Sequence, residues 1–297
     1  MSLNHTHPSP QPPARVVVLG AGGFLGRHFV QSLADGDIPV LALGSGEIDL
    51  SDAAAGAELK RRLQPSDALL FLSALTPDKG RTSATLMKNL AMARAVIEAV
   101  QAIDVAHLVY ASSDAVYSFA DPLISEATPS VPSDLYGAMH RTRELMLANE
   151  VKSPLALLRF SAVYGDGDTH NSYGPNRFIR QALKEGCISL GGDGEETRDH
   201  VYIDDAVALL KSVVMRRSTG MLNVVTGHSA SFRSVAESVA AMAGRPVAIQ
   251  ATPRQSPITH RSFDIVNLIR AFPNMRFTPM QEGIAATIAR TAEKASG

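Results

Sequence analysis

The sequence predicts an α/β protein built on a doubly wound parallel sheet, with a smaller second lobe formed by discontinuous C-terminal segments. Short apolar runs, such as residues 16–19 and 67–72, alternate with amphipathic stretches that are long enough for helices. Strands that are buried on both faces of a parallel sheet are continuously apolar, as these runs are. A chain of 297 residues suits one large domain of this kind or two closely joined ones.

Composition and charge exclude several classes of protein. Apolar residues make up 45% of the chain and charged residues 19%, as in ordinary globular proteins. The net charge of −1 argues against a general binder of nucleic acid or of membrane surfaces. The only cysteine, Cys187, excludes an internal disulfide and a cysteine-based zinc site. We expect no metal site.

Targeting and membrane-spanning segments are not expected. No apolar run approaches the roughly 18 residues that a membrane-spanning helix needs. The first 14 residues, rich in proline and polar residues, lack the apolar core of a signal peptide. We therefore expect residues 1–14 to be a disordered tail, and the protein to be cytoplasmic.

The first predicted strand leads directly into a glycine-rich turn. Residues 16–19 are apolar, Gly20, Gly22, Gly23 and Gly26 follow, and an apolar-periodic stretch after them predicts a helix. Glycine permits a positive φ and lets the backbone approach a pyrophosphate, whose charge is stabilised at a helix N-terminus. Strand, glycine turn and helix in this order are the context that a dinucleotide-binding unit requires. We expect this turn to bind NAD or NADP.

The end of the second predicted strand, residues 38–43, leaves the choice between these two cofactors open. An acidic residue usually follows this strand and binds the adenosine ribose of NAD. Here the first acids are Glu47 and Asp49, several residues later. Arg27 or Ser45 is an alternative ligand for the 2′-phosphate of NADP.

The remaining elements continue the alternation. The third strand is expected to be short or absent, and the long helix over 85–102 contains Asn89, which we expect to be structural. Further strands are predicted over 67–72, 107–110, 155–160 and 221–227, and further helices over 53–63, up to 148, 176–185, 232–243 (capped by Ser231) and 281–292.

Two polar stretches contain candidate catalytic side chains. The strand over 107–110 ends in a serine-rich segment that includes Ser113 and Asp114, and a later helix begins near Tyr136. Tyr136 and His140 are four residues apart and therefore share one helix face, so that both can point at one cofactor. Near neutral pH a histidine is only partly charged.

These motifs resemble the extended short-chain dehydrogenase/reductase family, the NAD-dependent epimerases and dehydratases of nucleotide sugars. The resemblance covers about residues 15–292. It rests on G-x-x-G-x-x-G at Gly20, Gly23 and Gly26, on Ser-Ser-x-x-Val-Tyr at 112–117, and on G-D-G-x-x-x-R-D-x-x-Y-V-x-D within 191–205. It also rests on P-x-S-x-Y-G-x-x-K at 132–140, where Ser133 stands one position from the expected serine and His140 replaces the lysine.

The resemblance implies roles for individual residues. Tyr136 would be the general acid/base, Ser113 would hydrogen-bond the same substrate oxygen, and His140 would hold the nicotinamide ribose. The implied cofactor ligands are Gly20, Gly23, Phe24, Leu25, Gly26, Asp49, Leu50, Ser73, Ala74, Tyr136, His140, Phe160 and Val163. The implied substrate ligands are Ser113, Asp114, Arg198 and Arg254, with the two arginines on a diphosphate.

The resemblance also implies a division of the chain. Residues 15–165 would form the dinucleotide-binding (Rossmann) domain, with returning segments at about 198–226 and 258–270. The remaining segments of 166–297 would form the substrate-binding lobe.

The expected activity is that of an NAD(P)-dependent nucleotide-sugar epimerase that acts by hydride transfer at a sugar carbon. The alternatives are a nucleotide 4-ketosugar reductase of the same family and, because His140 replaces the motif lysine, a non-catalytic NAD(P)-binding sensor. Dehydration is disfavoured, because Ala115 follows Asp114 where the dehydratases have a glutamate. The expected partners are a nucleotide-diphosphate sugar and a second copy of the chain in a homodimer.

Overall fold

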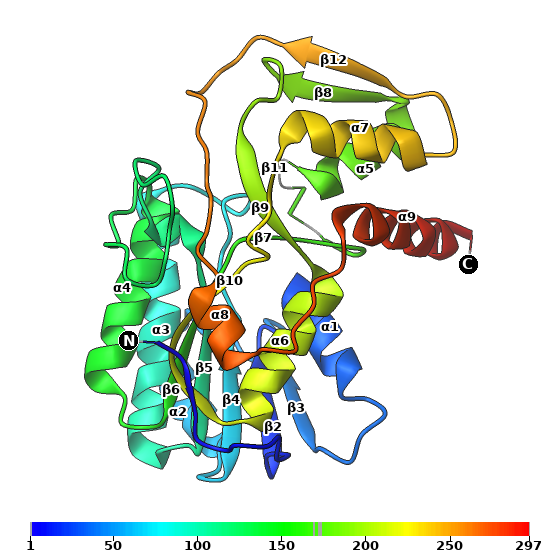
Figure 1. Cartoon of the computed structure of the whole chain (residues 1–297). Helices are drawn as coiled ribbons and strands as arrows, with labels where there is room; N and C mark the ends of the chain where they lie inside the picture. Colours follow the sequence, from blue (N-terminus) through cyan, green and yellow to red (C-terminus); the bar gives the residue numbers. More distant parts are fainter. Residues whose placement is uncertain (1, 169, 172–173, 297) are drawn as a thin grey trace.

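The computed structural model of the chain describes residues 2–168, 170–171 and 174–296 (Figure 1). Residues 1, 169, 172–173 and 297, which belong to the expected tail, to the segment after 165 and to the C-terminus, lie outside the described residues. A central sheet with helices on both faces forms the lower part of the molecule in Figure 1, and a smaller lobe lies above it.

The central sheet has seven strands in the order β1-β10-β6-β5-β4-β2-β3. Six of them are parallel, and β1 pairs antiparallel with β10 at one edge. No strand forms between β3 and β4 in the described chain, so the expectation of a short or absent third strand is confirmed. The strands are β1 (Asn4–His5), β2 (Arg15–Leu19), β3 (Val40–Leu43), β4 (Asp67–Phe71), β5 (His107–Ser113), β6 (Leu155–Phe160) and β10 (Ser218–Val224).

Helices cover both faces of this sheet, which explains why the central strands carry apolar side chains on both faces. In β2, Val16 and Val18 pack in the cluster that contains Phe29 of α1 (Phe24–Ser32) and residues of α6 (Ile203–Met215). The alternate side chains Val17 and Leu19 pack on the other face. The helices of that face are α2 (Ala55–Arg62), α3 (Ser83–Ile103) and α4 (Leu135–Glu150). The prediction of a doubly wound sheet is therefore confirmed.

The smaller lobe is built from separate C-terminal segments (Figure 1). Strands β8 (Cys187–Gly191) and β12 (Ala248–Thr252) pair in parallel, and α5 (Pro175–Glu185) and α7 (Phe232–Met242) pack beside them. Ser231 caps α7 as predicted, since its side chain accepts a hydrogen bond from the Ser234 amide. A three-stranded sheet of β7 (Ala162–Tyr164), β9 (Thr197–Tyr202) and β11 (Ser229–Ser231), together with α8 (Val266–Ala271) and α9 (Met280–Ser296), completes the fold.

The N-terminal residues are not the disordered tail that was expected. Leu3 is buried, and both ring nitrogens of His5 have partners, at 2.7 Å from the Ser218 hydroxyl and at 2.8 Å from the Ala271 carbonyl oxygen. The amide of Gln11 donates to the C-terminal end of α6. The prediction failed because these partners come from segments more than 200 residues later, which local composition does not reveal.

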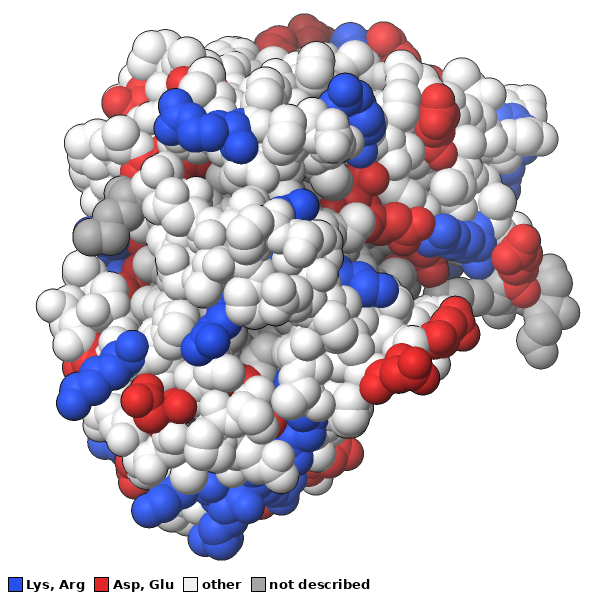
Figure 2. All heavy atoms as spheres, turned by 60° about the horizontal axis from the view of Figure 1, so that its bottom comes forward, with Lys and Arg blue, Asp and Glu red and all other residues white. Residues whose placement is uncertain are grey.

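Charged side chains are a minority on the surface that Figure 2 shows, which is the lower side of Figure 1. Most of this surface is uncharged, with basic side chains gathered at the bottom of the view and several acidic ones toward the right. Within the described part of the chain, no helix combines the length and apolar character that crossing a membrane requires. The features that distinguish a site lie instead where the sheet meets the lobe.

We expect the free energy of unfolding to decrease as the pH is lowered from about 6.5 to about 4. His107 is 2% exposed, its Nε2 lies 2.7 Å from the Ser218 carbonyl oxygen, and burial lowers its pKa to about 4. An unfolded histidine titrates near 6.5. In this window the unfolded chain therefore binds the additional proton, which costs the folded state about 3 kcal/mol across the whole window.

Denaturant unfolding at several pH values measures this dependence. His107→Gln, which still donates to the carbonyl oxygen, should flatten the slope, whereas His228→Gln, at an exposed histidine, should leave it unchanged. The same slope in His107→Gln and in the wild-type protein would contradict the assignment.

Candidate active site

The candidate site lies at the carboxyl ends of β2, β4 and β5. From β2 the chain continues to β3 on one side and returns to β4 on the other, and the crevice at such a switch point is where open α/β sheets bind ligands. Three segments meet there: the glycine turn after β2, the loop that begins at Ser73 after β4, and the end of β5 at Ser113.

The glycine turn depends on close approaches of the backbone. Gly20 has a φ of +88°, and a Cβ on Gly26 would lie inside 3.0 Å of the Gly20 carbonyl oxygen. The N-cap of α1 is Gly23, so no side chain caps this helix. The first-turn amides therefore remain available to an anion from outside the chain, and the positive end of the helix dipole favours one there.

The segment after β3 does not select one cofactor. The Glu47 carboxylate accepts a hydrogen bond from the Gly44 amide at 2.8 Å, and the exposed Asp49 bonds within its own turn. Arg27, an alternative ligand for a 2′-phosphate, donates to the Gly167 carbonyl oxygen at 2.6 Å. Glu47, Asp49 and Arg27 therefore each already form a hydrogen bond within the protein.

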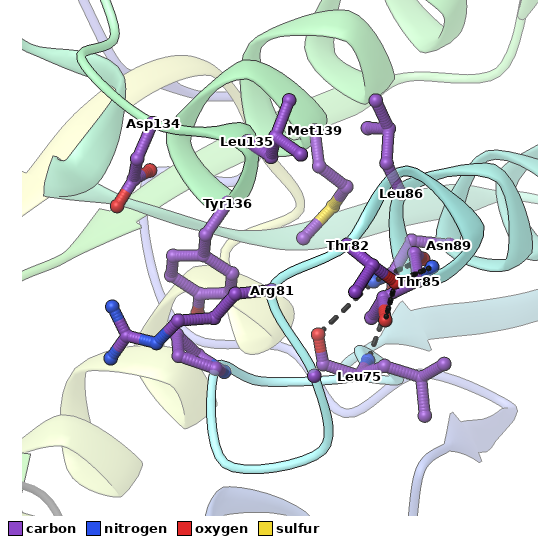
Figure 3. Close-up of a pocket in the computed structure, with 12 residues that line it drawn as sticks. Leu75, Arg81, Thr82, Thr85, Leu86, Asn89, Asp134, Leu135, Tyr136 and Met139 are labelled. Carbon is purple, nitrogen blue, oxygen red and sulfur yellow. Dashed lines mark hydrogen bonds between the residues drawn. The ribbon is translucent and has the colours of Figure 1, made fainter.

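Asn89 fixes the loop after β4 (Figure 3). Its Oδ1 accepts from the Leu75 amide at 2.9 Å, and its Nδ2 donates to the Leu75 carbonyl oxygen at 3.0 Å. The expectation that Asn89 is structural is therefore confirmed. A pocket of about 270 Å³ lies between this loop and the start of α4, with Tyr136 and Arg81 in its wall.

A second glycine brings α4 against the end of β5. A Cβ on Gly137 would lie inside 3.0 Å of the Ala115 carbonyl oxygen, so the first turn of α4 touches the segment that follows Ser113. The Asp134 side chain caps this turn by accepting from the Gly137 amide at 2.8 Å. Tyr136 therefore lies near Ser113, whose hydroxyl opposes the rise in the Tyr136 pKa that burial causes.

His140 lies beside Tyr136 on the same helix face, as predicted, with ring centroids 4.6 Å apart and planes at 88°. Its Nδ1 is 2.7 Å from the Tyr110 hydroxyl. Its Nε2 is buried and has no hydrogen-bond partner among the described residues. A buried hydrogen-bonding atom without a partner is uncommon, and it marks His140 as a candidate ligand of a bound group.

The expected partial charge on His140 is wrong. Burial, and secondarily the charge of Arg143, lower its pKa well below 6.5, so the ring is neutral near pH 7. Burial likewise raises the pKa of Tyr136, as do Tyr110 and Asp114, while Arg143 and Ser113 lower it. The positive influence on Tyr136 thus comes from Arg143 and not from His140.

The predicted substrate residues divide into two groups. Arg198 lies within electrostatic range of Asp114, donates to the Thr259 carbonyl oxygen at 2.8 Å, and is positioned over the Phe119 ring. Arg254 instead forms ion pairs with Glu195 and Glu196 in the lobe. Its charge is therefore largely compensated within the protein.

Sequence reasoning missed Arg261. This side chain is 3% exposed, donates to the Asp114 carbonyl oxygen and, at 3.0 Å, to that of Tyr117, and lies over Phe119 with 4.1 Å to the ring centroid. It holds the turn that follows Ser113. No motif in the sequence distinguished it from the neighbouring arginines.

Other predicted cofactor residues are largely packing residues in this structure. Phe160 ends β6 in register with Ser113 and is 7% exposed. Phe24 and Leu50 are also buried, and Val163 lies in β7. Leu25 is partly buried against the core, and Ser73 and Ala74 begin the loop after β4.

The residues present fit a dinucleotide cofactor. The glycine turn provides a surface that a Cβ would fill, α1 has no side-chain cap, and the His140 Nε2 is buried without a partner among the described residues. The first two features lie together at the carboxyl end of β2.

Comparisons with known proteins agree with this reading. Residues 16–224 match the sequence model of the NAD dependent epimerase/dehydratase family. The chain is 27% identical over 251 residues to an ADP-L-glycero-D-manno-heptose-6-epimerase of Cupriavidus pinatubonensis, covering 74% of this chain and 76% of that protein. It is 30% identical over 129 residues to the uncharacterized UDP-glucose epimerase YtcB of Bacillus subtilis, covering 42% of this chain but only 40% of that protein's length.

A solved structure is similar over almost the whole chain. MoeE5, in complex with UDP-glucose and NAD, superimposes with a TM-score of 0.79 at 26% identity, over 95% of this chain and 99% of that chain. The likeness includes the lobe as well as the sheet.

Gly26→Ala should weaken NAD binding at least about tenfold and lower the melting temperature, because its Cβ would collide with the Gly20 carbonyl oxygen. Gly22→Ala is the matched control, since nothing lies within 4 Å of its Cβ. Calorimetric titration with NAD and thermal melts measure both effects. Equal NAD affinity in the two variants would show that this contact does not shape the site.

Proposed function

Because the chain belongs to the NAD-dependent epimerase/dehydratase family, we propose that it is an NAD(P)-dependent epimerase of nucleotide sugars. Membership confirms the resemblance and the expected enzyme class, an NAD-dependent epimerase or oxidoreductase of the extended short-chain dehydrogenase/reductase type. The particular reaction, the substrate and the residue roles below are proposals.

The observation that carries the proposal is the placement of Ser113 beside Tyr136 at the edge of the glycine crevice. A tyrosine and a serine that can reach the same oxygen are suited to move a proton on and off a hydroxyl or carbonyl group. Relatives named as epimerases and the UDP-glucose and NAD complex of MoeE5 support a nucleotide-sugar substrate and an NAD-type cofactor.

Each residue has one task in the proposed mechanism. A bound NAD(P) would supply the hydride chemistry at a sugar carbon. Tyr136 takes the proton of the adjacent hydroxyl and gives it back, and Ser113 hydrogen-bonds the same oxygen. The neutral His140 offers its Nε2 to a ribose hydroxyl, while its Nδ1 is held by Tyr110.

The proposal assigns the glycine turn to the cofactor and the charged residues near Ser113 to the substrate. Gly20, Gly23 and Gly26 would lie against the pyrophosphate of NAD or NADP. Asp114 and Arg198 would lie on the substrate side, with Arg198 on the diphosphate of the nucleotide sugar. A homodimer remains a prediction.

Tyr136→Phe and Ser113→Ala should each lower kcat by roughly 10²–10⁴-fold, the usual contribution of proton transfer by a positioned group. Tyr202→Phe, a tyrosine that packs on Tyr164 away from the crevice, should leave kcat unchanged. NMR of a panel of UDP- and ADP-sugars incubated with the purified protein detects the epimer. Unchanged turnover in Tyr136→Phe would remove this mechanism.

The same panel separates the alternative functions. An epimerase uses no net cofactor and retains it through purification, whereas a ketosugar reductase consumes one NAD(P)H for each product. Thermal stabilisation by a nucleotide sugar without turnover, about 2.7 kcal/mol at 100 times the dissociation constant, would indicate a sensor.

Arg198→Ala should weaken nucleotide-sugar binding by about 1.5–3 kcal/mol, the scale of a hydrogen bond to a charged group. Arg254→Ala should weaken it less, because Glu195 and Glu196 already oppose that charge. Calorimetry should find the NAD(P) affinity unchanged in both variants. An equal loss of both ligands in Arg198→Ala would place this arginine in the cofactor site instead.

A further inference from the structure

Arg143 is a fully buried cation in the wall of the candidate site. It lies seven residues after Tyr136, two turns along α4, and is 0% exposed. Its guanidinium donates to the Ser73 carbonyl oxygen at 2.8 Å and to the Asn89 carbonyl oxygen at 2.6 and 2.9 Å. It also lies over the Phe71 ring, 4.8 Å from the centroid.

The hydrogen-bond acceptors around Arg143 are neutral. Besides the two carbonyl oxygens they are Asn89 Oδ1 at 3.0 Å and the sulfur of Met92. Among the described residues no carboxylate forms an ion pair with Arg143. Arg159, which is equally buried, has the usual arrangement, since its guanidinium pairs with the Glu144 carboxylate at 2.6 Å.

A buried cation without a counter-ion stabilises any anion that forms beside it, because little solvent screens the interaction. The groups that face Arg143 are Tyr136 and His140 from α4 and Tyr110 from β5. Glu144, also on α4, is engaged by Arg159. Of the three facing groups only the tyrosines can become anions, and of these only Tyr136 is partly exposed at the crevice.

Resting on the proposed function, we infer that Arg143 is a positioning residue that supplies the fixed positive charge for the phenolate form of Tyr136, while His140 stays neutral and only hydrogen-bonds. The phenolate accepts the proton of the sugar hydroxyl and becomes neutral, and it is regenerated when the proton returns. Arg143 exchanges no proton and does not touch the substrate.

The directions of the tyrosine pKa values agree with this geometry. Burial raises the pKa of both tyrosines, that of Tyr110 to about 12, and Tyr110 and Asp114 also raise that of Tyr136. Arg143 lowers the pKa of both. The same charge lowers the pKa of His140. One cation therefore favours a phenolate and disfavours an imidazolium in adjacent side chains.

The test is a titration of Tyr136, which does not depend on knowing the substrate. The chain has six tyrosines and no tryptophan, so the near-ultraviolet phenolate band is unobscured. Wild-type protein is titrated through the alkaline range with and without oxidised NAD, and Tyr136→Phe identifies the step that belongs to Tyr136. In Arg143→Gln, which keeps donors for the carbonyl oxygens, this pKa should rise by at least about one unit, and in Arg143→Lys it should stay near the wild-type value.

The pH dependence of kcat is a second measurement, because a merely structural role of Arg143 would not change it. Each unit of increase in the Tyr136 pKa lowers the phenolate fraction, and thus kcat at a fixed lower pH, about tenfold. Arg143→Gln should therefore regain kcat as the pH is raised, with an unchanged KM. Failure to find a sugar substrate would overturn the proposed function and leave the titration result standing.

Two results would overturn the inference. One is an equal Tyr136 pKa in the folded Gln and Lys variants, with folding checked by circular dichroism. The other is the absence of any Tyr136 phenolate step in the wild-type protein over the pH range in which it stays folded. If Arg143→Gln does not fold, the test uses the double variant His140→Lys, Arg143→Met. This variant moves the positive charge one helical turn nearer Tyr136, so the Tyr136 pKa should not exceed that of the wild-type protein. A higher Tyr136 pKa in the double variant would overturn the inference.

Discussion

The site depends on two places where backbone touches backbone and only glycine fits. Gly26 lets α1 rest on the carbonyl oxygen of Gly20, and Gly137 lets α4 rest on that of Ala115. The first contact sets the helix dipole of α1 at the crevice, and the second sets Tyr136 beside Ser113. A side chain at either position would push a helix away from its strand and separate the cofactor turn from the proton-transferring pair.

Burial then decides the charge state of the groups that these contacts bring together. It raises the pKa of the tyrosines and lowers that of His140, so the cluster would be neutral without Arg143. Arg143 is retained inside by carbonyl dipoles of Ser73 and Asn89. The loop after β4 and α3 therefore both have an electrostatic role, since the loop provides the Ser73 carbonyl group and α3 provides that of Asn89.

Much of this arrangement could be predicted from local pattern. Apolar runs and the glycine spacing located the strands of the sheet, and the i, i+4 relation placed Tyr136 and His140 on one face. Arg143 could not be recognised, because an arginine in a mid-helix segment with other charged residues is typical of a solvated surface. Arg261 and the buried Leu3 likewise depend on partners more than 140 residues away, and no local rule connects such segments.

A single charged side chain at position 140 would both hold the cofactor and supply positive charge to Tyr136. In the proposed site, His140 has the first task and Arg143 has the second. The His140 ring is fixed through Nδ1 by Tyr110, and its Nε2 is a buried, neutral hydrogen-bonding atom without a partner among the described residues. The positive charge lies one turn further along α4 and does not reach the crevice. Under the proposed roles, substitutions at 140 should act chiefly on how tightly the cofactor is held, and substitutions at 143 chiefly on how readily Tyr136 ionises. A protein built in this way can vary its retention of the cofactor without changing the basicity of its proton-transferring residue.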